Sequence, residues 1–425
     1  LLLSIVVGLA AVSEPVDRVV EAAVGRVAWR PVSGDIVVVA LDEKTLAKYG
    51  KNDFSMRRHA DVVDAIRNAG AKRLFIDFTY ERRQNDPELA LLANAVKRWQ
   101  KRVVLAASAK NAQGGKAELT NLPGPAFGTQ ALIACIGWQY EFWQVWRIPI
   151  ALEVGGKLVP SFSSLLAHRS SDKGGVYALD YSYRTDTIPY VSAADVLSGD
   201  AGRRELEGKD VVFAPTAATF QDNHYLPGSD PVPGAYIHVV GAETLKRGMP
   251  IDIGWLPGLL FAVIALLIGM AFRRARWFNA AALATVGIMI LGKIVLTTIL
   301  VSSSIGAGLF LVATIGANVS RTNRHRSAQR ENPVSGLPNF EALRSQAPFG
   351  SATVVAAKVV NFEDLAAFIP GDGISKLIEQ VTRRLLLASQ GTALHHDLDG
   401  TFAWLVPYYQ HSQIEGQLAG LAALF

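Results

Sequence analysis

The stretch GWLPGLLFAVIALLIGMAF at residues 254–272 opens the segment, ending at Val319, that decides the architecture of this chain. It contains no charged side chain. Two further apolar runs follow, Asn279–Leu300, with Lys293 as its one charge, and Ile305–Val319, with none. Each run approaches the roughly 20 residues that a helix needs to cross the hydrocarbon core of a bilayer. Because lipid offers the backbone no hydrogen-bond partners, such runs predict membrane-spanning helices.

Clusters of arginine lie on one side of these predicted helices. They are Arg273, Arg274 and Arg276 after the first run, and Arg321, Arg324, Arg326 and Arg330 after the last. The serine loop at 302–304, between the second and third runs, carries no charge. Since short loops rich in arginine stay in the cytoplasm, we expect the arginine side to be cytoplasmic.

The N-terminal run Leu1–Val12 is also apolar and begins without a methionine. We interpret it as the clipped end of a fourth spanning helix. A cleaved signal peptide is the alternative, but no basic leader is present by which to judge it. With four helices, residues 13–253 lie outside the cytoplasm and the chain after Arg321 lies inside. This is the layout of a transmembrane sensor.

Composition agrees with that layout. Half of the 425 residues are hydrophobic, and the rest of the chain leaves room for about two domains besides the helices. The net charge of +5 could indicate nucleic acid, but the arginines beside the helices account for much of it and suit anionic lipid headgroups. We therefore expect membrane lipid as a partner and no nucleic acid. A single cysteine, Cys135, excludes an internal disulfide framework and a zinc ribbon.

Strand and helix patterns alternate through residues 13–253. Asp35–Leu41 is a β-branched run typical of a buried parallel strand, and Asp42 after it can cap a helix. A helix at Met56–Ala69 and a strand at Lys72–Tyr80 continue the alternation. The later expected elements are Pro87–Trp99, Arg102–Ala107, Val176–Tyr183, Ser192–Leu197, Lys209–Ala214 and Ala235–Arg247. Such an order predicts an α/β domain with a mostly parallel sheet and helices on both faces.

Four residues are candidate ligand groups in this domain. Asp42 and Asp77 follow two strands that we expect to be neighbours, and open α/β sheets bind ligands at such strand ends. The alternative is that Asp42 caps a helix and Asp77 satisfies loop backbone. Asp222 and His224 have a spacing that could hold a metal, but without an adjacent third ligand a solvated loop is the simpler interpretation. The aromatic cluster at 138–146 could be a ligand platform, a dimer surface or core. No nucleophile elbow, Gly-rich phosphate loop or metal cluster is apparent.

Several blocks resemble a known family. They are DIVVVALDEKTLAKYG at 35–50, MRRHADVVDAIRNAGAKRLFIDF at 56–78, LVPSFSSLLAH at 158–168 and the stretch from Leu179 to Gly248. Together they look like the CHASE-two extracellular sensor domain. That family is typically held between one N-terminal helix and three later ones. The resemblance implies a bacterial signalling receptor with an unknown extracytoplasmic ligand or protein partner.

The C-terminal region resembles the start of a GGDEF domain, the catalytic module of diguanylate cyclases. ENPVSGLPNFEALR at 331–344 looks like the opening of that family, and ATVVAAKVVNFEDL at 352–365 like its first strand and turn. LIEQVTRRLLLAS at 377–389 resembles the following helix, and HHDLDGTFAWLVP at 395–407 falls where the signature hairpin belongs. The likeness implies a partial α/β GGDEF-like domain.

The chemistry of that family is not retained. A cyclase needs carboxylates to hold divalent metal against a triphosphate. By alignment, the first metal-binding aspartate falls on Lys358, and the nucleotide-contacting Asn-Asp pair on Ala366 and Ala367. The signature falls on Leu398 to Phe402, so that Asp399 and Gly400 are kept whereas Thr401 replaces an acidic ligand. The resemblance therefore implies a degenerate module with no catalytic residue and no metal site.

The predicted organisation consists of seven parts. They are a clipped transmembrane helix at 1–12, a sensor domain at 13–253, transmembrane helices at 254–272, 279–300 and 305–319, a signalling linker at 320–331 and a partial degenerate GGDEF-like domain at 332–425.

We interpret the chain as a homodimeric, multi-pass sensor of the bacterial inner membrane with a cytoplasmic C-terminus. Its module is expected to regulate cyclic di-GMP turnover, through an EAL phosphodiesterase domain in a longer natural protein. No cofactor is expected in this chain, and magnesium or manganese only with such an EAL domain. An active diguanylate cyclase and a non-enzymatic receptor that signals through protein contacts are the alternatives.

Overall fold

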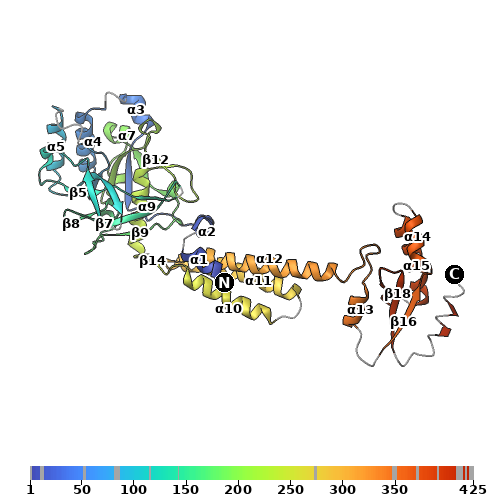
Figure 1. Ribbon diagram of the computed structural model, residues 1–425. Helices are drawn as coiled ribbons and strands as arrows, with labels where there is room; N and C mark the ends of the chain where they lie inside the picture. The colour runs from blue at the N-terminus through green and yellow to red at the C-terminus, as the bar shows by residue number, and fades with distance from the viewer. Residues whose placement is uncertain are drawn as a thin grey trace. The chain divides into compact units, whose positions relative to one another are not determined.

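A computed structural model gives the fold (Figure 1). It describes residues 2–9, 14–50, 54–80, 87–113, 116–141, 143–271, 275–346, 352–369, 373–389, 392–407, 415–416 and 419–420. The chain divides into two compact units. Unit 1 comprises Leu1–Ile268 and Ala281–Val312, and unit 2 comprises Gly269–Ala280 and Ala313–Phe425. Each is described by itself.

A mixed sheet forms the centre of unit 1. Its parallel part has the order β10-β1-β11-β2-β3, with β5 also parallel to β3. These strands are β1 Ile36–Leu41, β2 Arg73–Ile76, β3 Val103–Gln113, β5 Leu132–Cys135, β10 Tyr190–Ser192 and β11 Asp210–Pro215. The predicted strands after Asp35, Lys72, Arg102 and Lys209 are therefore confirmed.

The rest of the sheet corrects the expectation of a mostly parallel arrangement. β7 pairs antiparallel with β6, β8 and β9, and β4 pairs antiparallel with β3. Their bounds are β4 Lys116–Thr120, β6 Gln139–Glu141, β7 Gln144–Val154, β8 Lys157–Pro160 and β9 Gly175–Ala178. β7 and β8 are joined by Gly155 and Gly156 alone, and a connection that short permits only an antiparallel pair. The sheet is thus only partly parallel.

Helices cover both faces of the parallel part, as predicted. Side chains alternate along β1, so Val37, Val39 and Leu41 join one core while Ile36 and Val38 join the other. The first core lies under α3 Glu43–Tyr49, α4 Met56–Asn68, α5 Leu89–Lys97, α7 Ala193–Ser198 and α8 Arg203–Leu206. The second lies under α6 Phe162–Leu166 and α9 Gly234–Arg247. Minor elements are the 3₁₀ turns Pro125–Phe127, Thr185–Thr187 and Ala218–Phe220 and the strands β12 Asn223–His224 and β13 Val232–Pro233.

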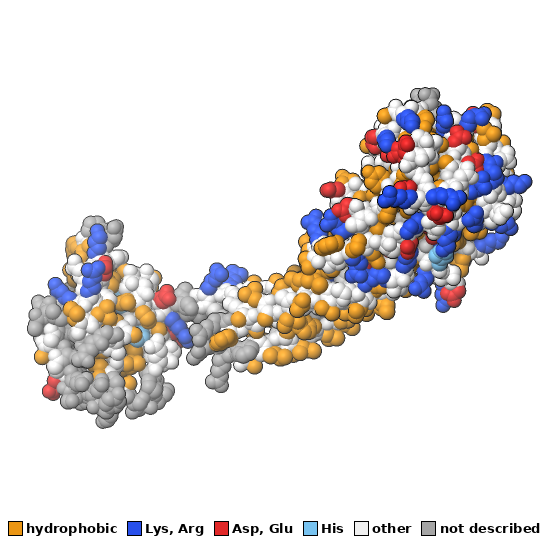
Figure 2. All heavy atoms as spheres, turned by 180° about the vertical axis from the view of Figure 1, so that it is seen from behind, with side chains coloured by type: hydrophobic (Ala, Val, Ile, Leu, Met, Phe, Trp, Pro, Cys, Tyr) orange, Lys and Arg blue, Asp and Glu red, His pale blue; other side chains and the backbone are white. Residues whose placement is uncertain are grey.

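Apolar helices follow this domain. They are α10 Leu256–Met270, α11 Ala275–Thr298 and α12 Gly306–Ala328, with α1 Leu2–Leu9 and α2 Glu14–Val27 at the N-terminus. In the described part of the chain, Trp277–Thr298 of α11 is the helix long and apolar enough to cross a membrane. α10 is apolar but shorter, and α12 becomes polar beyond Val319. Hydrophobic side chains cover the surface of this segment (Figure 2).

Among the described residues, the other three expected spans do not reach the apolar length of Trp277–Thr298, and the four-helix arrangement stays a prediction. α1 is eight residues long, and Arg273 and Arg274 lie outside the described residues. A two-residue parallel pair, β14 Ile251–Asp252 with β15 Val301–Ser302, joins the end of the sensor region to the α11–α12 loop.

Unit 2 contains a three-stranded antiparallel sheet of order β16-β18-β17. The strands are β16 Ala352–Lys358, β17 His395–His396 and β18 Thr401–Pro407, and the helices are α13 Phe340–Gln346, α14 Phe362–Phe368 and α15 Gly373–Ala388. Val355, Phe402 and Trp404 of the sheet pack against Ile378 and Leu385 of α15. The expected strand, helix and hairpin at these places are present.

Candidate functional site

The Asp42 side chain forms hydrogen bonds at the start of α3. Its Oδ1 accepts hydrogen bonds from the Thr45 amide at 2.9 Å, the Thr45 hydroxyl at 2.7 Å and the Ser192 hydroxyl at 2.8 Å. Asp42 thus caps α3, the use that the sequence offered as the alternative to ligand binding.

Asp42 and Asp77 do not follow neighbouring strands, contrary to expectation. β11 lies between β1 and β2 and pairs in parallel with both. The segment after β11 contains Asp222, so the carboxylate of Asp222, rather than that of Asp42, acts on Asp77. Sequence order hides this because β11 begins more than a hundred residues after β2.

Asp222, His224 and Tyr140 form a hydrogen-bonded chain. Asp222 Oδ1 lies 2.9 Å from His224 Nε2, and His224 Nδ1 lies 2.5 Å from the Tyr140 hydroxyl. The Gly234 amide donates to Asp222 Oδ2 at 3.2 Å. Tyr140 is exposed, whereas the His224 side chain is 17% exposed. The His224 ring is therefore the most buried member of the chain, since the Asp222 side chain is 32% exposed.

Asp77 lies at the inner end of this group. It is buried at the carboxyl end of β2, and its amide donates to the Phe213 carbonyl at 2.9 Å. Burial raises the pKa of Asp77 to about 7, and the nearby carboxylate of Asp222 adds to this rise. At neutral pH Asp77 can therefore exchange a proton with little cost.

His238 and Trp138 complete the group. Trp138 contacts the rings of both His224 and His238, with centroids 4.5 and 5.5 Å apart. Burial lowers the pKa of His238 to about 4, so its ring is neutral, and its Nε2 is a buried atom with no hydrogen-bond partner. In the sequence, His238 falls within the expected helix Ala235–Arg247, where a satisfied or exposed histidine is the ordinary interpretation. The sequence feature that could have pointed to His238 is its position in the first turns of α9, just after Gly234.

Gly234 permits the close approach of these elements. A Cβ there would lie 2.9 Å from Asp222 Oδ2 and 3.0 Å from the Trp138 ring. The predicted aromatic cluster is otherwise split, since Trp146 is core at 1% exposure whereas Trp143 is 90% exposed. Phe142 lies outside the described residues.

The arrangement suits recognition better than covalent chemistry. Asp77, Asp222, His224 and His238 present hydrogen-bond acceptors and proton-exchanging groups, but among the described residues no group of three or more histidines, cysteines and acids could hold a metal. Burial raises the pKa of the Cys135 thiol to about 12, which leaves it unreactive. We define Asp77, Asp222, His224, His238 and Tyr140 as the strand-end cluster.

The degenerate cyclase positions meet at a second place, in unit 2. Lys358 at the end of β16 is paired in register with Thr401 of β18, and its Nζ lies 3.2 Å from Asp399 Oδ2. Asp399 Oδ1 accepts from the Thr401 amide at 3.0 Å. Hydrogen bonding with Thr401, followed by the ammonium of Lys358, lowers the pKa of Asp399. The carboxylate kept from the signature is thus neutralised by an ammonium group.

The remaining positions lie around the same turn. Gly400 has a φ of +78°, and a Cβ there would lie 2.4 Å from the Phe362 ring. Ala366 and Ala367 lie on α14, which Phe362 begins. A cavity of about 510 Å³ between β16 and α15 is lined mostly by apolar side chains, with Lys358, Gln380 and Arg384 as its polar members.

Comparison with known families identifies the first unit. The CHASE2 domain matches residues 1–271. The chain belongs to the CHASE2 family. CHASE2 is an extracellular sensor domain, so the strand-end cluster lies within a sensor. The match ends at the close of α10, before α11 begins. None of the curated proteins or solved structures with which the chain was compared matches it.

Proposed function

We propose that this chain detects an extracytoplasmic signal with its CHASE2 domain and relays it across the bacterial inner membrane to a catalytically degenerate GGDEF-like module. The observation that carries the proposal is the CHASE2 match at 1–271 followed by the 22-residue apolar helix segment Trp277–Thr298. α12 then runs without a break from Gly306 to Ala328, as a signalling stalk would. The module regulates cyclic di-GMP turnover through an EAL phosphodiesterase domain of the longer natural protein.

The residues around the second site support an inactive module. A diguanylate cyclase holds divalent metal with carboxylates. Here Lys358 stands at the alignment position of one ligand and Thr401 at another, and the ammonium of Lys358 engages Asp399. Ala366 and Ala367 offer no side-chain hydrogen bond to a nucleotide. No cofactor is assigned to this chain, and magnesium or manganese would belong to the EAL domain.

The test is an assay of the natural protein, with its inner domain completed, in membranes supplied with GTP and magnesium. We expect no cyclic di-GMP from GTP, and hydrolysis of cyclic di-GMP where an EAL domain is present. Synthesis that is lost in Asp399→Asn would instead establish an active cyclase. Neither synthesis nor hydrolysis would favour a receptor that signals by protein contacts alone.

The strand-end cluster is the proposed place of detection. Its acceptor groups suit a small polar ligand that donates hydrogen bonds, entering past exposed Tyr140. Differential scanning of the purified protein against libraries of amines and polyols tests this, with Asp222→Asn as the variant that removes the central carboxylate. A ligand that stabilises both proteins equally binds elsewhere.

A further inference from the structure

Helix α2 places two carboxylates against the start of α12 and the loop before it. Asp17 is 8% exposed, and its Oδ1 accepts from the amides of Ile305 at 2.7 Å and Gly306 at 2.8 Å. Its Oδ2 accepts from the Ser304 hydroxyl at 2.5 Å. Asp17 thus caps α12 although 288 positions separate it from Ile305. A carboxylate there satisfies orphan amides and complements the helix dipole.

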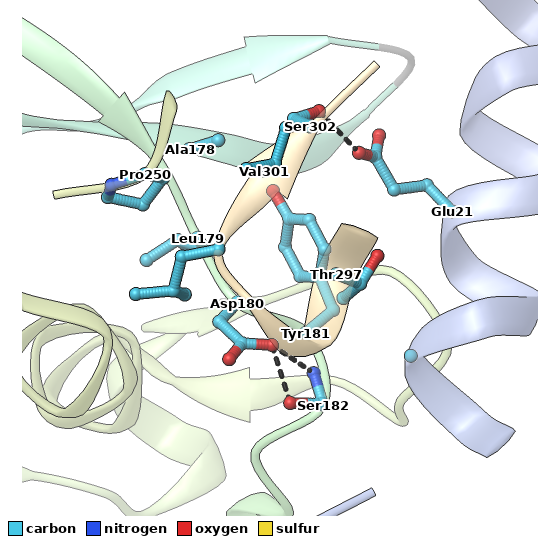
Figure 3. A pocket seen from close by; sticks show the side chains of 12 residues that line it. Glu21, Ala178, Leu179, Asp180, Tyr181, Ser182, Pro250, Thr297, Val301 and Ser302 are labelled. Atoms are coloured by element: carbon cyan, nitrogen blue, oxygen red, sulfur yellow. Dashed lines mark hydrogen bonds between the residues drawn. The ribbon is translucent and has the colours of Figure 1, made fainter. Parts of the chain in front are cut away.

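One turn further along α2, Glu21 binds Lys293 of α11. Glu21 Oε1 lies 3.1 Å from Lys293 Nζ and accepts from the Ser302 hydroxyl at 3.2 Å, a bond drawn in Figure 3. Lys293 also donates to the Ser303 carbonyl at 2.7 Å. The Lys293 side chain is 3% exposed and that of Glu21 is 17% exposed. We call Asp17, Glu21 and Lys293, with the loop 302–305, the latch.

Other residues of α2 contact the sensor domain. The Arg18 guanidinium lies 4.4 Å from the Trp146 ring centroid of β7. Gly25 packs so closely on Tyr181 that a Cβ would lie 2.9 Å from the Tyr181 carbonyl oxygen. Arg26 Nε donates to the Gly228 carbonyl at 3.1 Å. α2 therefore contacts sensor and membrane helices at once.

A separate attachment holds the end of α11. Arg247 of α9 donates to the Thr298 carbonyl at 2.7 Å, and the Ile251 amide to the Leu300 carbonyl at 2.9 Å. The sensor region also holds the loop before α12, since the Ile253 amide donates to the Ser302 carbonyl at 2.9 Å and the Ser304 amide to the Gly254 carbonyl at 3.0 Å. The cap on the first turn of α12, however, comes from Asp17 of α2. A movement of α2 against the sheet would therefore act directly on the start of α12.

We propose that α2 is the transmission element of this protein and that the latch couples it to α12. This inference rests on the proposed sensor function and specifies how the signal enters the stalk. The coupling resists separation because it includes the buried ion pair of Glu21 and Lys293. Removing one partner of such a pair leaves an uncompensated charge. The latch therefore holds one arrangement of α2 and α12 until the sensor domain moves α2.

The test measures the distance between α2 and α12 in the full chain. Spin labels are attached at Val19→Cys and Phe310→Cys, two exposed positions, in a Cys135→Ser background in lipid nanodiscs. Pulsed electron resonance should give one narrow distance distribution. Asp17→Ala with Lys293→Met should lose that narrow distribution. Glu14→Gln, which alters the ion pair with Arg18 inside α2, should keep it.

Exchanging the charges of Glu21 and Lys293 tests whether a broadened distance distribution comes from loss of the ion pair rather than from misfolding. Glu21→Lys alone should broaden the distribution, and Glu21→Lys with Lys293→Glu should restore the narrow one. The inference is overturned if the latch variants keep the wild-type distribution or if the exchanged pair does not restore it. Output is read separately as cellular cyclic di-GMP. If distances respond and cyclic di-GMP does not, the latch stands and the proposed output is wrong.

Discussion

At the residue scale, the strand-end cluster contains a residue, Asp77, whose burial suits ligand recognition but costs folding free energy. Asp77 is buried beside Asp222, and both carboxylates cannot be ionised cheaply in one place. A residue chosen for packing alone would be apolar here. The raised pKa of Asp77 thus identifies a position where the fold tolerates a cost, as is common at binding sites.

Asp77→Asn should stabilise the protein at neutral and higher pH. Folding raises the pKa of Asp77 from 3.8 to about 7, so the folded protein holds a proton that the unfolded chain releases. The free energy of unfolding therefore falls as the pH rises from about 4 to about 7. The substitution removes this loss, on the order of 2–4 kcal/mol at pH ~8.

Thermal unfolding of both proteins in detergent at several pH values checks this. The two midpoints should converge below pH ~3, where Asp77 is mostly protonated in either state. A gap that does not change with pH would show that packing, rather than the titration of Asp77, causes the difference.

Alanine substitutions at Gly400 and Gly336 distinguish the cost of backbone strain from the cost of steric overlap. Both have a positive φ, +78° and +68°, but a Cβ at Gly400 meets Phe362 whereas one at Gly336 meets nothing within 4 Å. Gly336→Ala should cost about 1–2 kcal/mol from the left-handed backbone alone. Gly400→Ala should cost more, because Phe362 must also move. Hydrogen exchange of the β16 and β18 amides in the intact protein measures both. Equal effects would contradict the close contact.

At the element scale, Arg73 joins three elements of the sensor domain. It forms a two-point ion pair with Asp210 of β11, at 2.9 and 2.6 Å, and donates to the Leu165 and Leu166 carbonyls of α6. The Asp210 side chain is 8% exposed. Arg73→Lys keeps the charge but loses the planar fork, so we expect a loss of about 1–3 kcal/mol.

Urea unfolding of the purified protein provides the measurement for Arg73→Lys. Arg184→Lys is the matched control, because its pair with Asp186 is exposed on both sides. It should leave the midpoint unchanged. Similar losses in the two variants would mean that the fork geometry of Arg73 is irrelevant.

α12 is the element that would form a dimer stalk. Gly308 packs against α10 of the same chain, since a Cβ there would lie 2.7 Å from the Gly258 carbonyl oxygen. A Cβ at Gly316 would have nothing within 4 Å. The later part of α12 is therefore the part that a second copy could approach. Single cysteines from Ala317 to His325 in native membranes should form intersubunit disulfides with helical periodicity. Absence of disulfides at every position would exclude a parallel stalk.

At the scale of the whole molecule, the proposed topology puts the CHASE2 domain outside and unit 2 inside. Lys157→Cys and Ser345→Cys are the reporters, because both positions are exposed. Ser303 would be a poor reporter, since it is buried in the latch at 4% exposure. An impermeant maleimide should label Lys157→Cys in intact spheroplasts and Ser345→Cys only after permeabilisation. Labelling of Ser345→Cys in intact cells would reverse the orientation.

The sequence by itself determined the local elements. The β-branched run of β1, the periodicity of α4 and the apolar length of α11 depend on neighbours a few residues apart, so they can be read along the chain. The resemblance likewise assigned Lys358 and Asp399 to one family site, although it did not predict their contact. Lys358 ends β16 and Asp399 lies in the turn just before β18, and these two strands pair in antiparallel register.

Only the tertiary structure decided which distant segments meet. β11 enters between β1 and β2, which brings Asp222 rather than Asp42 toward Asp77. Asp17 caps a helix that starts at Gly306, and Glu21 neutralises Lys293. Such pairings depend on the free energy of the whole packed chain, because strand order and buried charge are settled by partners that local sequence does not specify.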